Sequence, residues 1–527
     1  MLRCGRSAAR SSRRRGQLAQ LLLLFFAAVV LAALARRVGA PYPVFLALGG
    51  ALLAFLPGAP SISFPPELVL ALFVAPVLLD AAYDTSLRDL RDNWVPVTGL
   101  VVFAVGLTTA AVAAVAHALV PSMPWAAAIV LGAVVAPPDA VAATAVLRPL
   151  RPPHRLLTIL EGESLLNDAS ALLIYRLAVG AVAAGGFSIG TVAPTFLVAV
   201  VGSLIVGPAL GWAVLRVIAR VQHVPTAIIL QFVSTFAVWL LAEHIGLSGV
   251  LTTVCYAVAL ARRGPELTPA RVRIPSYAVW ETALFALNIL AFIFVGLQIR
   301  PILASLEASQ RAPYFAVAGV VLATVIVVRF AWQMSFNSLV RWRHRERGFH
   351  PPRPMLRPTV GSGLVISWAG MRGIVTLAAA LALPDGFPYR DLIVLTAFSV
   401  VLGTLVIQGL TLKPLMRAFH LRDGDPVGDE VAAARERALR AALESFADDQ
   451  STVAELLRKE LKASLTVQDG NGAGAAWRAS HSEIRGRALH AARQAVLAMR
   501  SSEAIGDDAF HRMEEELDWL EMASGAE

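Results

Sequence analysis

The chain has 527 residues, of which 57% are hydrophobic and 16% are charged, and its mean hydropathy is +0.64. This composition excludes an ordinary soluble multidomain protein and is typical of a polytopic membrane protein. The formal net charge of +9 would suit a nucleic-acid partner, but the arginines lie in short loops between apolar runs, which indicates membrane orientation, and we expect no nucleic acid to bind.

Residues 1–16 are a basic N-terminal tail, followed by an apolar run from Leu18 to Ala35. No small-residue cleavage site follows this run, so we interpret it as a retained first membrane helix. Apolar length and turn or charge punctuation define the further spans. They cover residues 41–56, 68–82, 95–120, 125–147, 156–184, 191–218, 226–242, 247–261, 277–299, 312–334, 360–383 and 392–415. The sequence therefore predicts an all-α polytopic membrane domain over residues 17–420, with about thirteen transmembrane helices.

The arginines of the loops predict the orientation of these helices. Loops after odd-numbered helices carry 19 arginines, against 9 in the even-numbered loops and the N-terminal tail together. Because positive charge favours the cytoplasmic side, the odd-numbered loops and the C-terminus are expected inside the cell. The same count places the basic N-terminal tail outside, which the rule does not explain.

Residues 421–527 differ in composition from the rest of the chain. They are rich in Ala, Glu and Arg with helical periodicity, and a glycine-rich DGNGAGA segment divides them. This pattern predicts a cytoplasmic helical domain. Two interpretations stay open, a regulatory domain and a dimerisation or solubilising tail.

A polar stripe interrupts the apolar span at 156–184. Asp168 lies twelve residues beyond Leu156, roughly 18 Å along a helix and hence near the middle of a hydrocarbon layer about 30 Å thick. Ser164 lies one helical turn from Asp168, and Glu163 lies one turn from Asn167. A carboxylate at that depth is costly, so the stripe favours an ion or proton site. The alternative is a polar stripe that only packs neighbouring helices.

Two of the predicted spans contain helix-breaking residues. Pro137 and Pro138 interrupt the fifth span beside Asp139, and the twelfth span reads WAGMRG, with Gly370, Arg372 and Gly373. Broken helices leave free backbone groups at membrane depth, and a pair of them in the two halves of a transporter with inverted repeats indicates its binding site. The alternative for the fifth span is a simple proline kink.

The other arginine and lysine residues limit the classes of function that are possible. Arg329 lies within an apolar span and needs a partner, for which Glu163 is the candidate in a structural ion pair. The three lysines, Lys413, Lys459 and Lys462, lie at or beyond the last helix end. No phosphate-binding loop of the GxxxxGK[ST] type occurs, so ATP-driven pumping is not expected and the chain is not expected to be an enzyme.

In combination these motifs resemble the monovalent cation/proton antiporters of the first cation/proton antiporter family, the sodium/proton exchangers, in their bacterial form. The resemblance rests on GESLLNDA and APPDAVAATAVL, and is supported by APVLLDAAY, VVRF, WAGMRG and VIQGLTLKPL. It extends over nearly all of residues 17–420, which would then be a transmembrane antiporter domain.

The resemblance implies roles for individual residues. Asp168 would alternate between a proton and a cation, while Asp139 and Ser164 would help to line the site, so that Na+ would lie on Asp168 and Asp139. Asn167 would stand where electrogenic relatives have a second aspartate. The usual Thr-Asp-Pro of the family reads Pro138-Asp139-Ala140 here, which leaves the choice among Na+, K+ and Li+ open.

We therefore predict an electroneutral exchanger of Na+, or alternatively Li+ or K+, for a proton. It would work by alternating access without a cofactor, as a homodimer in the bacterial cytoplasmic membrane, and would serve pH homeostasis. An electrogenic or K+-selective antiporter is the alternative within this class. From a different class, a cation channel or a non-transporting sensor stays open.

Overall fold

The computed structural model describes residues 22–56, 66–183, 189–348, 358–421, 426–466, 472–502, 504 and 507–523, so the predicted basic tail of residues 1–16 lies outside the described residues. The chain divides into two compact units, Met1–Gly424 and Asp425–Glu527. Among the described residues every regular element of both units is helical.

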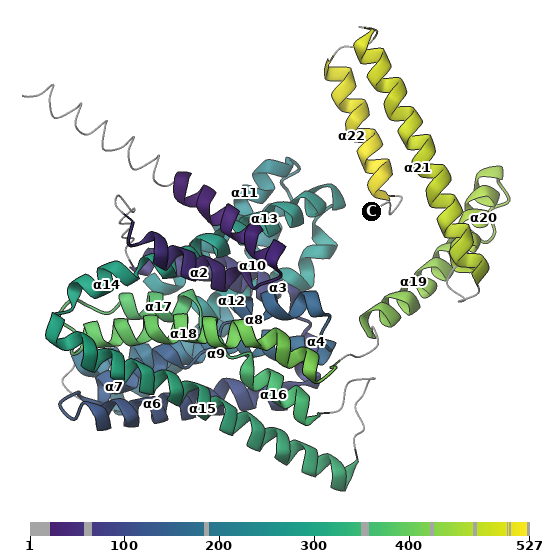
Figure 1. Cartoon of the computed structure of the whole chain (residues 1–527). Coiled ribbons are helices and arrows are strands. Elements are labelled where there is room, and N and C mark those ends of the chain that lie inside the picture. Colours follow the sequence, from purple (N-terminus) through teal and green to yellow (C-terminus); the bar gives the residue numbers. More distant parts are fainter. Residues whose placement is uncertain are drawn as a thin grey trace, which may run out of the picture. The chain divides into compact units, whose positions relative to one another are not determined.

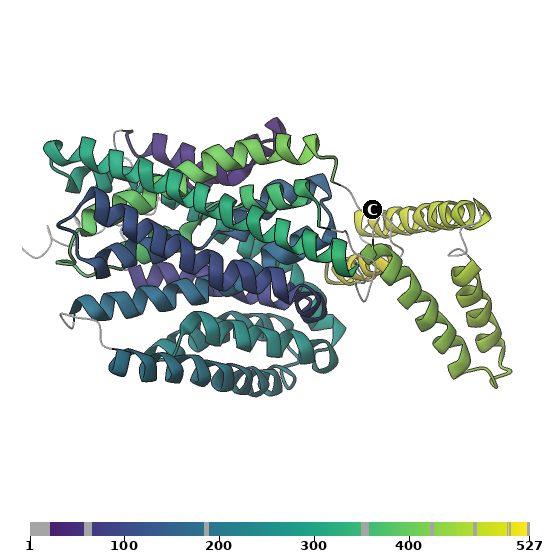
Figure 2. The same ribbon diagram turned by 90° about the horizontal axis from the view of Figure 1, so that it is seen from below.

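The first unit is a bundle of helices (Figures 1 and 2). After a helix over residues 22–38 it contains α2 (Tyr42–Leu53), α3 (Pro66–Asp84), α4 (Leu87–Asp92), α5 (Trp94–Thr98), η1 (Gly99–Ala104), α6 (Val105–Leu119), α7 (Trp125–Val135), α8 (Ala140–Leu147), η2 (Arg148–Leu150), α9 (His154–Ala183), α10 (Ile189–Ile218), α11 (Val224–His244), α12 (Gly249–Leu267), α13 (Ala270–Leu297), α14 (Ile299–Ser305), α15 (Ala308–Arg347), α16 (Val360–Trp368), α17 (Ile374–Leu381) and α18 (Arg390–Ala418). Helices α10, α11 and α12 contact one another and form one layer of the bundle, at the bottom of Figure 2.

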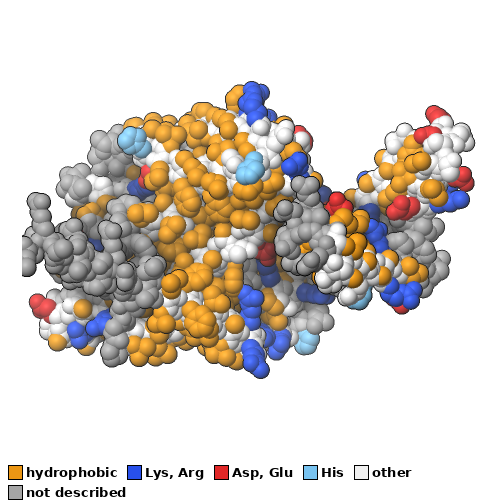
Figure 3. Space-filling view, turned by 90° about the horizontal axis from the view of Figure 1, so that it is seen from above, with side chains coloured by type: hydrophobic (Ala, Val, Ile, Leu, Met, Phe, Trp, Pro, Cys, Tyr) orange, Lys and Arg blue, Asp and Glu red, His pale blue; other side chains and the backbone are white. Residues whose placement is uncertain are grey.

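Length and hydropathy mark this unit as membrane-spanning. Eight helices in the described part of the chain are long and apolar enough to cross a membrane, and Tyr42–Leu53 and Leu68–Tyr83 are shorter apolar helices. The space-filling view shows a broad hydrophobic face on this unit, with charged side chains towards its margins (Figure 3). An apolar surface of this extent is expected where lipid is the solvent.

Two helices of the bundle are broken near their middles. Helix α7 ends at Val135 and α8 begins at Ala140, because the two prolines between them cannot continue a helix. Helix α16 ends at Trp368 and α17 begins at Ile374. The two breaks touch, since the backbone nitrogen of Asp139 donates to the backbone oxygen of Met371 at 2.6 Å.

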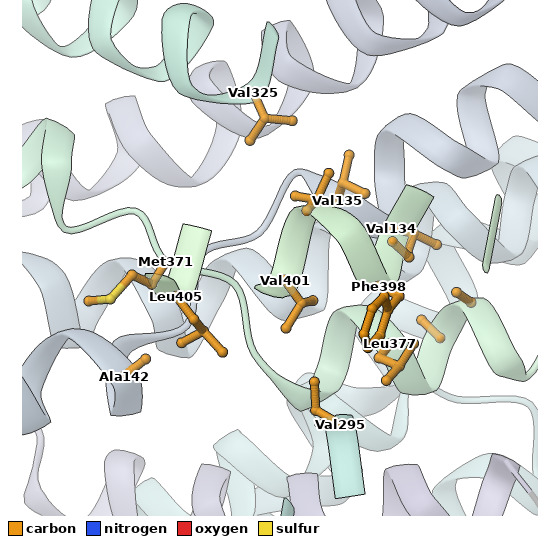
Figure 4. Packing of buried hydrophobic residues seen from close by; sticks show 14 of the residues in the cluster. Val134, Val135, Ala142, Val295, Val325, Met371, Leu377, Phe398, Val401 and Leu405 are labelled. Atoms are coloured by element: carbon orange, nitrogen blue, oxygen red, sulfur yellow. The ribbon is translucent and has the colours of Figure 1, made fainter. Parts of the chain in front are cut away.

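Apolar side chains surround the point where the two helix breaks touch, which we call the crossing. Val135, Met371 and Leu377, from the two broken helices, are buried in one hydrophobic cluster with Phe398 and Val401 of α18 (Figure 4). Helix α18 contacts α7, α8 and α17. The irregular backbone at membrane depth is therefore covered by protein and not by lipid, as it must be to avoid unsatisfied polar groups in hydrocarbon.

Some predicted element bounds differ from those observed. The span predicted at 312–334 belongs to α15 (Ala308–Arg347), because its basic continuation RWRHRER also suits a helix, and hydropathy marks only the apolar part. The span predicted at 277–299 begins earlier, at Ala270. The span predicted at 95–120 is one helical span, Trp94–Leu119, and its residues Gly99–Ala104 form the π-helical turn η1.

The second unit consists of four described helices, α19 (Pro426–Ser445), α20 (Thr452–Thr466), α21 (Gly472–Ser501) and α22 (Asp507–Ala523). Val496, Phe510 and Leu517 form a small buried cluster between α21 and α22. Arg493 of α21 forms ion pairs with Asp518 and Glu521 of α22, so this helix pair is held by both apolar and charged contacts.

Candidate ion-binding site

The polar stripe of α9 faces the break between α7 and α8. Ser164 accepts a hydrogen bond on Oγ from the backbone nitrogen of Ala140 at 3.2 Å. Asn167 donates from Nδ2 to the backbone oxygen of Pro138 at 3.3 Å. These two contacts satisfy backbone groups that the proline break leaves free, so α9 and the broken helix form one polar centre inside the bundle.

The two aspartates meet at this centre. Asp139 begins α8 as its N-cap, and its Oδ1 accepts a hydrogen bond from the backbone nitrogen of Val141 at 2.9 Å. Asp139, Ser164 and Asp168 line one cavity of about 70 Å³, together with Asn288 of α13. The structure thus brings Asp139 together with Ser164 and Asp168, which lie 25 and 29 residues further along the chain. A cavity of this size can hold a small ion with some water.

Oxygen atoms dominate the ligands available in this cavity. Two carboxylates and a hydroxyl suit a proton or an alkali cation, whose hydration shell is replaced by oxygens. In the described residues Asn167 Oδ1 is buried without a hydrogen-bond partner, so it is a further oxygen beside the site. No group of three or more His, Cys, Asp or Glu side chains in the described chain could hold a transition metal.

Arg372 supplies a buried positive charge at the crossing of the broken helices. Its guanidinium donates to the backbone oxygens of Val135 at 3.0 Å, Ala136 at 3.1 Å and Gly370. Its backbone nitrogen donates to Thr404 Oγ1 at 3.0 Å. The Arg372 guanidinium therefore lies against the carbonyl end of α7, where the helix dipole is negative. This arrangement satisfies carbonyls that the broken helices leave without an intrahelical donor.

Glycine at position 373 is required by Asp139. A Cβ atom at Gly373 would lie 1.8 Å from Asp139 Oδ2, far inside contact distance. The backbone of Gly373 is extended, so the requirement is for space and not for an unusual φ. The glycine predicted as a helix breaker thus also makes room for a site carboxylate.

Glu163 and Arg329 form a buried ion pair. Arg329 donates from Nη1 to Glu163 Oε1 at 2.5 Å and from Nη2 to Oε2 at 2.9 Å, and the two residues are 3% and 1% exposed. Arg329 also donates to the backbone oxygens of Ser367 at 3.2 Å and Ile366 at 3.1 Å. The pair thus joins α9, α15 and the end of α16, and its donors are used internally, which suits a structural role.

Two residues of the site received no binding role from the sequence. Glu161 of α9 and Asn288 of α13 line the small cavity with the aspartates. Glu161 lies seven residues before Asp168. That spacing places both on one face of α9, and it is the signal that could have identified Glu161.

Comparisons with known proteins agree with this architecture. A family model described as sodium/hydrogen exchanger, transmembrane, matches residues 22–418. A Mycobacterium tuberculosis protein named as an uncharacterized Na+/H+ exchanger is 33% identical over 92% of this chain and 92% of its own length. A sodium, potassium, lithium and rubidium/H+ antiporter of Bacillus pumilus is 28% identical over 92% of this chain and 74% of its own length.

The fold is also similar to a solved structure. The sodium proton antiporter MjNhaP1 from Methanocaldococcus jannaschii aligns with a TM-score of 0.58 and 16% identity, covering 77% of this chain and 98% of that one. At that identity the likeness concerns the fold alone. The family match, by contrast, confirms the resemblance predicted from the motifs and identifies a transporter and not an enzyme. The chain belongs to the sodium/hydrogen exchanger family of membrane proteins, which exchange cations for protons.

Proposed function

We propose that this chain exchanges one monovalent cation for one proton by alternating access, with Asp168 as the group that holds either of them. The observation that carries the proposal is the small cavity lined by both Asp168 and Asp139, beside the point where the breaks of two helices touch. A carboxylate that binds a cation cannot keep its proton, so each displaces the other, and this competition couples the two fluxes.

Electroneutral exchange is the stoichiometry that the charges favour. Asn167 cannot titrate, and Lys413 lies near the end of α18, where its Nζ donates to the backbone oxygen of Gly39 at 2.9 Å. Neither supplies a second proton at the cavity. Electrogenic exchange, the alternative, would require Asp139 to release a proton in each cycle as well.

Na+ is the cation that we propose first, with Li+ and K+ as alternatives. The name of the Bacillus pumilus relative includes all three ions. Proline at position 138 offers no side-chain oxygen at the break, so the carboxylates of Asp139 and Asp168 have one neutral oxygen fewer beside them. Charge without a closely fitted shell of oxygens discriminates weakly between ions, so we expect more than one of these cations to be exchanged.

The membrane architecture is also proposed. The eight long spans, with the helix over residues 22–38, α2, α3, α12 and the α16–α17 pair, would give about thirteen passes. The two broken helices support inverted repeats. The arginine count supports a cytoplasmic C-terminal domain in the cell membrane, and a homodimer that serves pH homeostasis is part of the same proposal.

The test is exchange by purified protein in proteoliposomes that contain a pH-sensitive dye. Adding Na+ or Li+ should move protons in a saturable way, and the initial rate should not change when valinomycin and K+ set membrane potentials of either sign. Asp168→Asn should abolish this movement, because asparagine keeps the shape and cannot titrate. An active Asp168→Asn protein, or a rate that depends steeply on potential, would show that another carboxylate takes part in the coupling, and Asp139 is the candidate. Cation flux without proton movement would indicate a channel.

A further inference from the structure

A second ion pair joins the wall of the candidate site to the wall of a larger cavity. The larger cavity has a volume of about 800 Å³ and is lined by Arg148, with Asp80 and Glu281 also on its wall. Glu161 belongs to the small cavity that holds Asp139 and Asp168. Asn288 lines both cavities, so the two are neighbours. Arg148 Nη2 contacts Glu161 Oε1 at 3.1 Å, so this ion pair links a residue of the larger cavity to a residue of the smaller one.

The positions of the two residues along their helices link them to the site. Glu161 precedes Asp168 by two helical turns on the same face of α9, about 10 Å along the axis. Arg148 follows the last residue of α8, the short helix that Asp139 begins. The α8 segment therefore carries a site carboxylate at one end and the partner of Glu161 at the other.

The pair is exposed enough to open. The side chains of Arg148 and Glu161 are 63% and 28% exposed, and ion pairs with such access to water are weak and exchange partners readily. The buried Glu163–Arg329 pair, in contrast, has further internal partners for its arginine. A cation that enters from the larger cavity can replace Arg148 as the counterion of Glu161, whereas the arginine repels that cation until it moves away.

We propose that Arg148 and Glu161 form a gate on the path to Asp168, in which Glu161 receives the entering cation and Arg148 competes with it. This inference rests on the proposed exchange function. Glu161 and Arg148 are then residues that set the apparent cation affinity, and Asp168 remains the group that exchanges the proton.

The gate predicts opposite effects for two neutral substitutions. Arg148→Gln should lower the half-saturating Na+ concentration, and Glu161→Gln should raise it, each by about two- to fourfold for a charge about 10 Å from the ion in a partly solvated path. A purely structural ion pair would predict changes in the same direction, because either substitution breaks the same contact. The measurement is the initial rate of proton movement against Na+ concentration in proteoliposomes.

A charge-swapped protein and a matched control sharpen the test. Arg148→Glu combined with Glu161→Arg can rebuild the contact but replaces the carboxylate at the small cavity by a positive charge, so half-saturation should stay above that of the wild type. A return to the wild-type value would overturn the gate. Arg176→Gln is the control, since Arg176 of α9 pairs with Glu243 at comparable exposures of 45% and 32% but lines neither cavity. It should leave half-saturation unchanged.

The outcomes separate this inference from the function on which it rests. Equal half-saturation in the wild type, Arg148→Gln and Glu161→Gln proteins, with Asp168→Asn inactive, would overturn the gate alone. Absence of exchange in the wild type would overturn both. Thermal unfolding of each variant in detergent identifies any variant that fails to fold, and the charge-swapped protein then decides.

Discussion

Adding one methyl group at Gly373 should displace the Asp139 carboxylate. The new Cβ would lie 1.8 Å from Asp139 Oδ2 and 2.6 Å from Cγ, where contacts under 3.0 Å are essentially never seen. The carboxylate must therefore shift by about 1.2 Å, which removes its 2.9 Å hydrogen bond with the backbone nitrogen of Val141. Losing an N-cap of this kind costs about 1–2 kcal/mol. We expect Gly373→Ala to be destabilised by that amount.

The same displacement should weaken cation binding. If Asp139 helps to hold the ion, a loss of about 1.4 kcal/mol raises the half-saturating concentration about tenfold. Initial rates in proteoliposomes measure this change, and thermal unfolding in detergent measures stability. Gly180→Ala is the control, because a Cβ there meets nothing within 4 Å. Wild-type half-saturation in a folded Gly373→Ala protein would refute the assignment of Asp139 to the site.

Two further predictions concern the ion pair and the second unit. Glu163→Gln and Arg329→Gln should each lower the free energy of unfolding by about 3–5 kcal/mol, because each leaves a lone buried charge. The double variant should lose clearly less than the sum of the two. Additive losses of unfolding free energy in detergent would show that the two residues do not stabilise each other. A chain ending at residue 421 should still exchange, with a changed pH or ion dependence, since the family match ends at residue 418. Loss of all transport by a well-folded truncated protein would contradict this.

Much of the fold and part of the site could be predicted from local sequence signals. Consecutive prolines cannot continue a helix, so Pro137 and Pro138 marked a break that depends on no other segment. Helical periodicity placed Ser164 and Asp168 on one face of α9 without knowledge of its neighbours. Glu163 could be named as the partner of Arg329 because few carboxylates lie within the apolar spans.

The remaining features depend on contacts between distant segments. The hydrogen bond between Asp139 and Met371 joins residues that are far apart in the chain, and no periodicity reports it. The steric need for glycine at position 373 exists only because Asp139 lies against it. The π-helical turn Gly99–Ala104 likewise has no local sequence signature. One of its backbone groups is bound by a distant residue, since Trp332 donates to the backbone oxygen of Gly99 at 3.0 Å.

The charges around the two helix breaks are consistent with the proposed exchange of one cation for one proton. Glu163 and Arg329 neutralise each other, whereas the Arg372 guanidinium donates hydrogen bonds to carbonyl groups, which carry no net charge. With a monovalent cation bound to ionised Asp139 and Asp168, the sum of the charges is zero. With the cation replaced by one proton, the sum is again zero. Because a net charge in a low-dielectric interior is costly, both loaded states are favoured over a state that has lost the cation without gaining a proton.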